Sequence, residues 1–330
     1  FRYNKINVNK IKPLFAGKNE IGWLGLSRMT MTKTILTFYK FVHLKKPQDK
    51  KGKLVSFLEE THTVGTIILS SEGINGMCSL DTDKLEQVKS FLQRNFMLTN
   101  SDLKENVSNS NVFKKLSVKV KKEIVTLGLP NINPAVSVGT YIEPEEWDTF
   151  ISKKGVVTID TRNDFEVELG TFKGSINPKT IDFRDFSMWW KEKSKTFKDK
   201  KIAMFCTGGI RCEKATSFLK SEGLEEVYHL KGGILNYFDK VGDSATSKWR
   251  GDCFVFDQRV TVNPRLEPSD YDLCHACRGP LRIDDKKHMH YEKGISCHNC
   301  FGTKTEKKIS SLKERKKQIE LTKDRTNKNE

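Results

Sequence analysis

One cysteine, Cys206, lies between a predicted strand and a predicted helix, and this arrangement constrains the fold more than any other feature of the chain. The residues Lys201–Phe205 form a short apolar run after a Lys-rich turn. Downstream, apolar residues recur at helical spacing until Gly223, which is expected to end the helix. We therefore expect Cys206 at the C-terminal end of a strand in a parallel sheet, where α/β proteins place their functional sites.

The loop that follows Cys206 is predicted to form a nest for an anion, and its residues are Thr207, Gly208, Gly209, Ile210 and Arg211. The two glycines let the backbone curl with its N–H groups inward, and the next helix points its positive dipole end there. Lowering the pKa of a cysteine from about 8.5 to about 6 takes roughly 3.4 kcal/mol, which two or three charge-assisted hydrogen bonds supply. Cys206 is thus the candidate reactive thiolate; a buried structural cysteine beside a glycine turn is the alternative.

A second predicted strand, Val156–Asp160, precedes the Cys206 strand, and a helix is expected from Pro144 to Phe150. This alternation of strands and helices is typical of a parallel sheet. Asp160 and Arg162 lie at the end of this neighbouring strand, so they either brace the crevice through a salt bridge or take part in its chemistry. Cys212 could resolve an oxidised Cys206, but a position inside a helix favours a side chain that points elsewhere.

In the first third of the chain the predicted elements follow the order strand, helix, strand, strand, helix and strand, which is a ferredoxin-like order. The last of these strands has an apolar face with Leu116 and Val118 and a basic face with Lys115, Lys119 and Lys121. Binding of RNA phosphates and protection of an exposed sheet edge by lysines explain the basic face equally well.

Two cysteine pairs, Cys274-x-x-Cys277 and Cys297-x-x-Cys300, lie near the C-terminus with nineteen residues between them. Four thiolates at this spacing can complete a tetrahedral zinc site, and the binding energy can replace a core that this small segment lacks. Unliganded reduced cysteines are the alternative. Beyond them, the charged residues 304–330 are expected to be a basic tail with a frayed helix.

The composition limits the kinds of partner that the chain is expected to bind. It has 330 residues and a formal net charge of +16, which favours a polyanion such as nucleic acid, although scattered solvated lysines would give the same charge. Eight cysteines, six of them in motif-like positions, indicate reduced thiols rather than a disulfide scaffold. No apolar run approaches the roughly 20 residues of a membrane span. The sequence indicates no protein partner.

Several motifs resemble those of known proteins. Cys-x-x-Gly-x-Arg resembles the active loop of rhodanese domains, and Val157 to Arg162 and Val227 to Gly233 resemble their other signature segments. The longer string from Cys206 to Lys214 is similar to that of the rhodanese-domain tRNA uridine hydroxylases, as are Ser71 to Gly76 and the cysteine pairs. The resemblance covers about residues 33 to 302.

This resemblance implies a multidomain chain of α/β and α+β parts. The expected organisation is an extension at 1–32, a ferredoxin-like (acylphosphatase-like) domain at 33–127, a linker at 128–135, a rhodanese-like domain at 136–245, a Cys-rich segment at 246–303 and the tail at 304–330. The extension is basic and expected to be disordered; organelle targeting and a cloning-derived leader both explain it. The protein is expected to be cytoplasmic, with organelle targeting by residues 1–32 as the alternative.

The function implied by the resemblance is 5-hydroxylation of the wobble uridine of tRNA, with dioxygen as co-substrate. The sequence has no Gly-x-Gly-x-x-Gly flavin or nicotinamide fingerprint. A sulfurtransferase that carries a persulfide on Cys206 is an alternative that the loop alone supports equally well. A non-catalytic RNA-binding scaffold is a third interpretation, for which the charge and the cysteine pairs suffice.

Overall fold

The computed structural model describes residues 32–108, 111–129 and 131–327. The predicted extension at 1–32 therefore lies, up to residue 31, outside the described residues. Within these ranges no helix is both long and apolar enough to cross a membrane.

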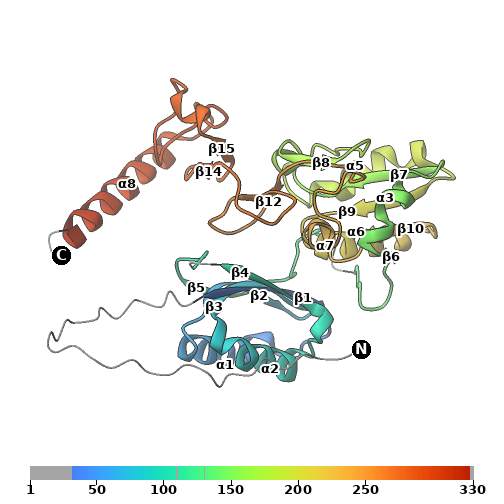
Figure 1. The fold of residues 1–330 in the computed structure, drawn as a ribbon, viewed down its shortest axis with the longest axis horizontal. Coiled ribbons are helices and arrows are strands. Elements are labelled where there is room, and N and C mark those ends of the chain that lie inside the picture. The colour runs from blue at the N-terminus through green and yellow to red at the C-terminus, as the bar shows by residue number, and fades with distance from the viewer. Residues whose placement is uncertain (1–31, 109–110, 130, 328–330) are drawn as a thin grey trace, which may run out of the picture. The chain divides into compact units, whose positions relative to one another are not determined.

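The first domain is a sheet with two helices packed on one face (Figure 1). Its elements are β1 (Lys33–Phe41), α1 (Pro47–Glu60), β2 (Val64–Ser70), β3 (Gly73–Asp81), α2 (Leu85–Phe96), β4 (Leu103–Ser108) and β5 (Leu116–Val120). The strand order is β4-β1-β3-β2-β5, antiparallel throughout except for the parallel pair of β2 and β5. Each helix buries one stripe against the sheet: Leu54 and Leu58 on α1, and Val88, Leu92 and Phe96 on α2.

The ferredoxin-like order is confirmed, but the prediction that the strand with Leu116 and Val118 is its last strand is wrong. That position in the sheet belongs to β4, which pairs with β1, whereas β5 is an additional strand at the opposite edge. The sequence gives no signal for β4, because Lys104 and Glu105 are exposed and Val107 is 75% exposed. An edge strand without a buried face lacks the alternation that predicts strands.

The second domain is a parallel sheet with helices around it (Figure 1). Its elements are β6 (Thr140–Ile142), α3 (Pro144–Ile151), β7 (Val156–Asp160), α4 (Asp164–Val167), β8 (Gly170–Phe172), α5 (Asp185–Lys193), β9 (Lys201–Phe205), α6 (Ile210–Ser221), β10 (Val227–Leu230) and α7 (Gly233–Lys240). The strand order is β6-β10-β9-β7. Within β9, residues Ile202 to Phe205 have no exposed surface, as expected for a central parallel strand with both faces covered.

The C-terminal part contains short strand pairs and one long helix. Its elements are β11 (Trp249–Gly251), β12 (Cys253–Phe254), β13 (Thr261–Val262), β14 (Tyr271–Leu273), β15 (Pro280–Arg282) and α8 (Glu306–Asn327). Since β11 pairs with β8, the start of the expected Cys-rich segment packs with the second domain. Short 3-10 helices lie at Thr82–Lys84, Asn100–Asp102, Ser194–Phe197 and Asp284–Lys287. The expected tail is helical as far as Asn327.

A buried lysine connects the first domain to α6. The ammonium of Lys214, which has no exposed surface, donates to Glu72 at 2.7 and 2.9 Å and to Glu123 at 2.6 Å. It also donates to the carbonyl of Val125 at 3.2 Å. A buried charge is stable only when it is paired and hydrogen-bonded, so these contacts hold the first domain against the helix that follows Cys206.

Candidate active site

Cys206 lies where the sequence predicted it, between the end of β9 and the start of α6. Gly209 precedes the helix with a φ of 97°, a conformation that favours glycine, and its N–H donates to the Cys206 sulfur at 3.1 Å. Cys206 is only 1% exposed. The loop therefore brings a backbone donor and the N-terminus of a helix to one enclosed sulfur atom, as an anion site requires.

This environment favours the thiolate. Burial raises the pKa of Cys206, but the Cys212 thiol, the Arg211 guanidinium and the N–H groups of Cys212 and Gly209 outweigh it and lower the pKa to about 6. At neutral pH the anion therefore predominates, which makes this sulfur the strongest candidate nucleophile of the chain.

Arg211 acts on the loop through a carboxylate. Its guanidinium donates to both oxygens of Glu166, at 2.7 and 2.8 Å, and approaches the Thr207 hydroxyl at 3.4 Å. Glu166 is fully buried on α4, where it also accepts from the N–H of Asn163 in a capping box. The bidentate Arg211–Glu166 pair fixes the loop, while the positive charge of Arg211 still stabilises the thiolate.

The far side of the loop rests on the N-terminus of α7. The N–H of Ile234 donates to the carbonyl of Cys206 at 2.9 Å, and the N–H of Leu235 donates to that of Thr207 at 3.1 Å. A Cβ at Gly233 would lie 2.5 Å from the same Cys206 carbonyl oxygen, so only glycine fits there. By contrast, a Cβ at Gly208 would meet open space.

The expectation that Cys212 points away from Cys206 is wrong. Its buried thiol lies near enough to the Cys206 sulfur to lower the pKa of Cys206, and it lies 3.4 Å from the Thr161 hydroxyl. Burial and the neighbouring thiolate raise the pKa of Cys212 well above its usual value, so it remains a neutral donor. The helix begins close enough to the cysteine loop for its first turn to face the sulfur.

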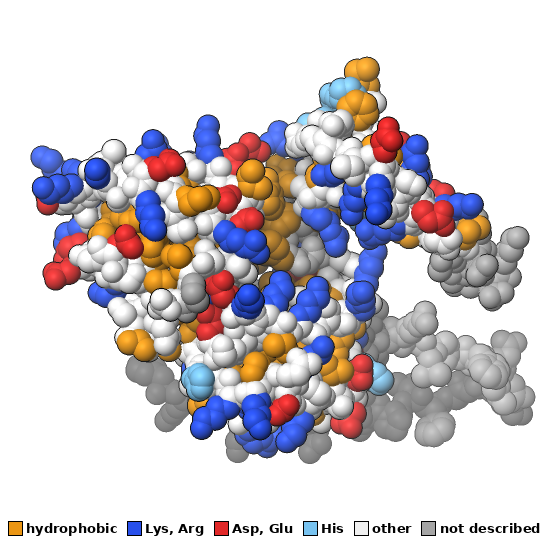
Figure 2. All heavy atoms as spheres, turned by 180° about the vertical axis from the view of Figure 1, so that it is seen from behind, with side chains coloured by type: hydrophobic (Ala, Val, Ile, Leu, Met, Phe, Trp, Pro, Cys, Tyr) orange, Lys and Arg blue, Asp and Glu red, His pale blue; other side chains and the backbone are white. Residues whose placement is uncertain are grey.

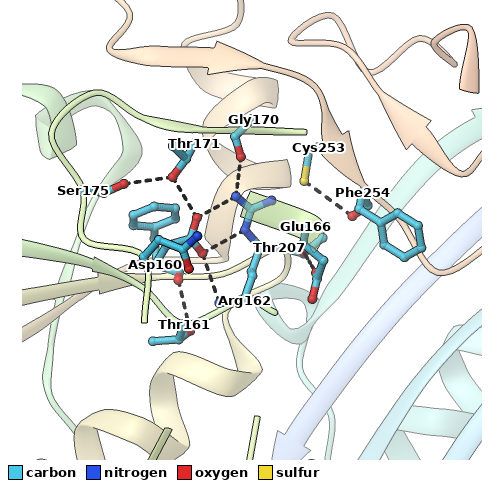
Figure 3. Close-up of polar contacts among 12 residues, drawn as sticks. Asp160, Thr161, Arg162, Glu166, Gly170, Thr171, Ser175, Thr207, Cys253 and Phe254 are labelled. Atoms are coloured by element: carbon cyan, nitrogen blue, oxygen red, sulfur yellow. Dashed lines mark hydrogen bonds and ion pairs between the residues drawn. The ribbon is translucent and has the colours of Figure 1, made fainter. Parts of the chain in front are cut away.

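Asp160 and Arg162 form a buried ion pair with each other (Figure 3). The Arg162 guanidinium donates to Asp160 at 2.9 and 2.6 Å and also to the Gly170 carbonyl, and Thr171 donates to Asp160 at 2.8 Å. Neither side chain has exposed surface. Arg162 also lies over the ring of Trp249, at 5.3 Å. The pair ties β7 to β8 and β11, which favours bracing over chemistry.

Two side chains beside the loop have no motif that would have identified them. Tyr39, on β1 of the first domain, donates to Glu213 on α6 at 2.8 Å. A Cβ added at Gly209 would lie 2.7 Å from the Tyr39 hydroxyl oxygen, so this phenol covers the loop. The two residues are 174 positions apart in the sequence. Only the tertiary structure brings them together.

The predicted RNA contacts lie elsewhere, along β5 at the edge of the first sheet. Lys119 lies on the strand and Lys115 and Lys121 flank it, and all three are exposed. On the opposite face Leu116, Val118 and Val120 pack on the core, as the alternation predicted.

The four paired cysteines converge on one point. The ligand atoms of Cys274, Cys277, Cys297 and Cys300 all lie within 4.8 Å of one another, with sulfur–sulfur distances of 3.9, 3.8 and 3.7 Å among them. A disulfide needs about 2.05 Å. A tetrahedral ion with Zn–S bonds of about 2.3 Å places its sulfurs about 3.8 Å apart, so the cluster fits zinc.

The fold and the cysteine loop are those of a rhodanese-like domain that follows an acylphosphatase-like domain. Residues 143–240 match the model of the rhodanese-like domain, and residues 33–124 match the UPF0176 acylphosphatase-like domain. The chain is 45% identical over 290 residues to a protein named tRNA uridine(34) hydroxylase from Acaryochloris marina (strain MBIC 11017), covering 88% of this chain and 93% of the relative. The chain belongs to the tRNA uridine(34) hydroxylase family.

Solved structures resemble parts of the chain. A rhodanese-related protein from Thermoplasma volcanium is 28% identical, with a TM-score of 0.25, over 31% of this chain and 93% of its own. A rhodanese-like domain from Anabaena is 16% identical, with a TM-score of 0.28, over 34% of this chain and 78% of its own.

The bracing pair gives a first prediction. Asp160→Asn leaves the buried Arg162 charge without its partner and should lower the free energy of unfolding by about 3–5 kcal/mol, measured by urea denaturation. Asp239→Asn, which removes a half-exposed partner of Lys240, is the matched control and should change it by less than about 1 kcal/mol. An Asp160→Asn protein of unchanged stability but without activity would instead give Asp160 a chemical role.

Proposed function

We propose that this protein hydroxylates C5 of the wobble uridine in tRNA, with the Cys206 thiolate as nucleophile and dioxygen as co-substrate. The family of the chain supports the reaction and the substrate. The observation that carries the role of Cys206 is its enclosed sulfur, which accepts from the Gly209 N–H and has a pKa lowered to about 6.

A thiolate can activate this position of the base. In the proposal, the Cys206 sulfur adds to C6 of uridine, the C5–C6 double bond opens, and C5 becomes electron-rich. One oxygen atom of dioxygen then forms a bond to C5. The other leaves as water, with two electrons and two protons from a thiol reductant.

Nucleoside analysis of tRNA tests this function. In cells that lack the protein, nucleosides derived from 5-hydroxyuridine should fall. They should return with the native chain but not with Cys206→Ser, because a hydroxyl is a far poorer anion at neutral pH. Cys78→Ser is the matched control, since Cys78 is buried in the core of the first domain and should not be needed for the modification.

The alternatives predict different nucleosides. Loss of a thiolated base with 5-hydroxyuridine intact would favour sulfur transfer through a Cys206 persulfide. An unchanged nucleoside profile would favour a scaffold and contradict the proposal.

The exposed lysines on β5 are proposed to bind tRNA phosphates. Figure 2 shows Lys and Arg side chains spread over the surface in that view, in keeping with the net charge of +16. Lys115, Lys119 and Lys121 lie on one side of a strand whose other side is packed, so their charges face outward together.

Salt dependence measures such contacts. Replacing Lys115, Lys119 and Lys121 by Gln should weaken tRNA binding and reduce the slope of log affinity against log salt by up to about 3, one per phosphate lost. A control triple at Lys191, Lys195 and Lys198, which are also exposed, corrects for net charge. Equal slopes for the two triples would leave edge protection as the role of the β5 lysines.

We also propose that Cys274, Cys277, Cys297 and Cys300 bind one structural zinc ion. The convergence of their sulfurs at tetrahedral distances supports it. Four thiolates leave no open position for chemistry, so the ion would stabilise the segment.

Metal analysis tests the zinc site. Protein purified without chelator should contain about one zinc per chain, and Cys297→Ser should release it and expose residues 270–302 to proteolysis while the second domain stays folded. Cys253→Ser, at a buried cysteine outside the cluster, should keep its zinc. Wild-type protein that contains no zinc and still resists proteolysis at residues 270–302 would refute the site.

A further inference from the structure

A carboxyl group lies near the Cys206 sulfur but is not part of the loop that surrounds it. Glu213, in the first turn of α6, accepts from the Tyr39 hydroxyl at 2.8 Å, and Tyr141 on β6 lies near enough to lower the pKa of this carboxyl. Tyr39 covers Gly209, whose N–H donates to the Cys206 sulfur. Phenols from two domains therefore flank one carboxylate next to the Cys206 loop, and the Tyr39 phenol orients it.

In the described part of the chain Glu213 pairs with no cation, because the basic residues near it in the sequence bind other carboxylates. Arg211 and Lys214, on either side in the sequence, are bound to Glu166 and to two carboxylates of the first domain, respectively. Among the described residues, no Lys or Arg lies within ion-pair distance of Glu213. A carboxylate that is hydrogen-bonded by a neutral phenol but unpaired with a cation keeps its ability to take up a proton.

The electrostatics agree with this geometry. Burial raises the pKa of Glu213, the hydroxyls of Tyr39 and Tyr141 lower it, and the charges of Cys206 and Asp102 raise it, with a net result above the usual value. A carboxylate whose pKa is raised toward neutrality is a better general base. The ionisable groups that face it are Tyr39 on β1, Tyr141 on β6, Cys206 in the loop and Asp102 before β4.

We propose that Glu213 is the base that removes the C5 proton of uridine when the Cys206–uridine adduct breaks down. This rests on the proposed addition of the Cys206 sulfur to C6. The C5–H bond breaks, its electrons form the C5–C6 double bond, and the C6–S bond breaks with its electron pair returning to Cys206. The proton ends on a carboxylate oxygen of Glu213, and this step consumes no oxidant.

Other bases near the loop suit the step less well. Glu166 is bound by Arg211, and despite its burial this charge and its hydrogen bonds lower the pKa of Glu166. Asp160 is enclosed with Arg162. His229 is 1% exposed, and burial lowers its pKa to about 3. Glu213 is partly exposed and oriented by the Tyr39 phenol, so it combines access with basicity.

Exchange at C5 isolates this proton transfer from oxidation. tRNA with 5-tritiated uridine is incubated with the full chain in deoxygenated buffer, and tritium released to water is counted. Wild type should release tritium, because reversible addition at C6 lets C5 gain and lose protons. Glu213→Gln, which keeps the hydrogen-bond acceptor but not the base, should slow release by about 100-fold or more.

Further variants separate base catalysis from a structural role. Glu213→Asp should restore part of the exchange. Glu213→Gln should lower kcat for hydroxylation with little change in KM, and Glu222→Gln, at an exposed residue just beyond α6, should match wild type. Tyr39→Phe removes a hydrogen bond that lowers the pKa of Glu213, so its acidic limb of exchange should move to higher pH and gives a second test if Glu213→Gln fails to fold.

The outcomes distinguish this inference from the function on which it rests. Tritium release by wild type and by Glu213→Gln at equal rates would overturn the role of Glu213 while leaving Cys206 as nucleophile. Absence of release by wild type would also overturn it. Hydroxylation by Cys206→Ser would instead overturn the proposed nucleophile.

Discussion

The site depends on keeping a negative charge on a sulfur atom that is almost fully enclosed. Burial alone would favour the neutral thiol, so the pKa of about 6 requires donors and a positive charge around Cys206. Lowering the pKa from about 8.5, as in a free cysteine, to about 6 corresponds to roughly 3.4 kcal/mol of preference for the anion. The Gly209 N–H, the Cys212 thiol and N–H, and the Arg211 charge supply it, and Glu166 and α7 hold them in position.

The first domain contributes side chains to this site. Glu72 and Glu123 enclose Lys214 on α6, and Tyr39 reaches the loop next to Cys206. These contacts come from separate parts of the first domain and meet on consecutive residues of one helix, Glu213 and Lys214. The two domains are therefore joined directly beside the Cys206 loop.

The position of Cys206 and the elements around it could be predicted from the sequence, because they depend on local patterns. The buried run of β9, the two glycines and the arginine predicted the place of Cys206, because a strand, a turn and a helix are local features. Tyr39 and Glu213 could not be predicted, since their contact joins β1 to α6 and each is unremarkable in its own segment. The strand β4 was missed because it buries too little to show alternation, and Cys212 because its orientation depends on where α6 begins.

Titration of the Cys206 thiolate tests the central claim most directly. The ultraviolet absorbance of thiolate is followed with pH in the native chain, and the same curve for Cys206→Ser is subtracted. Because the folded pKa is lowered, the difference signal should appear as pH rises through about 6, and the stability that the thiolate contributes should be lost as pH falls through the same value. A difference signal that appears only near about 8.5, as for a free cysteine, would contradict the account.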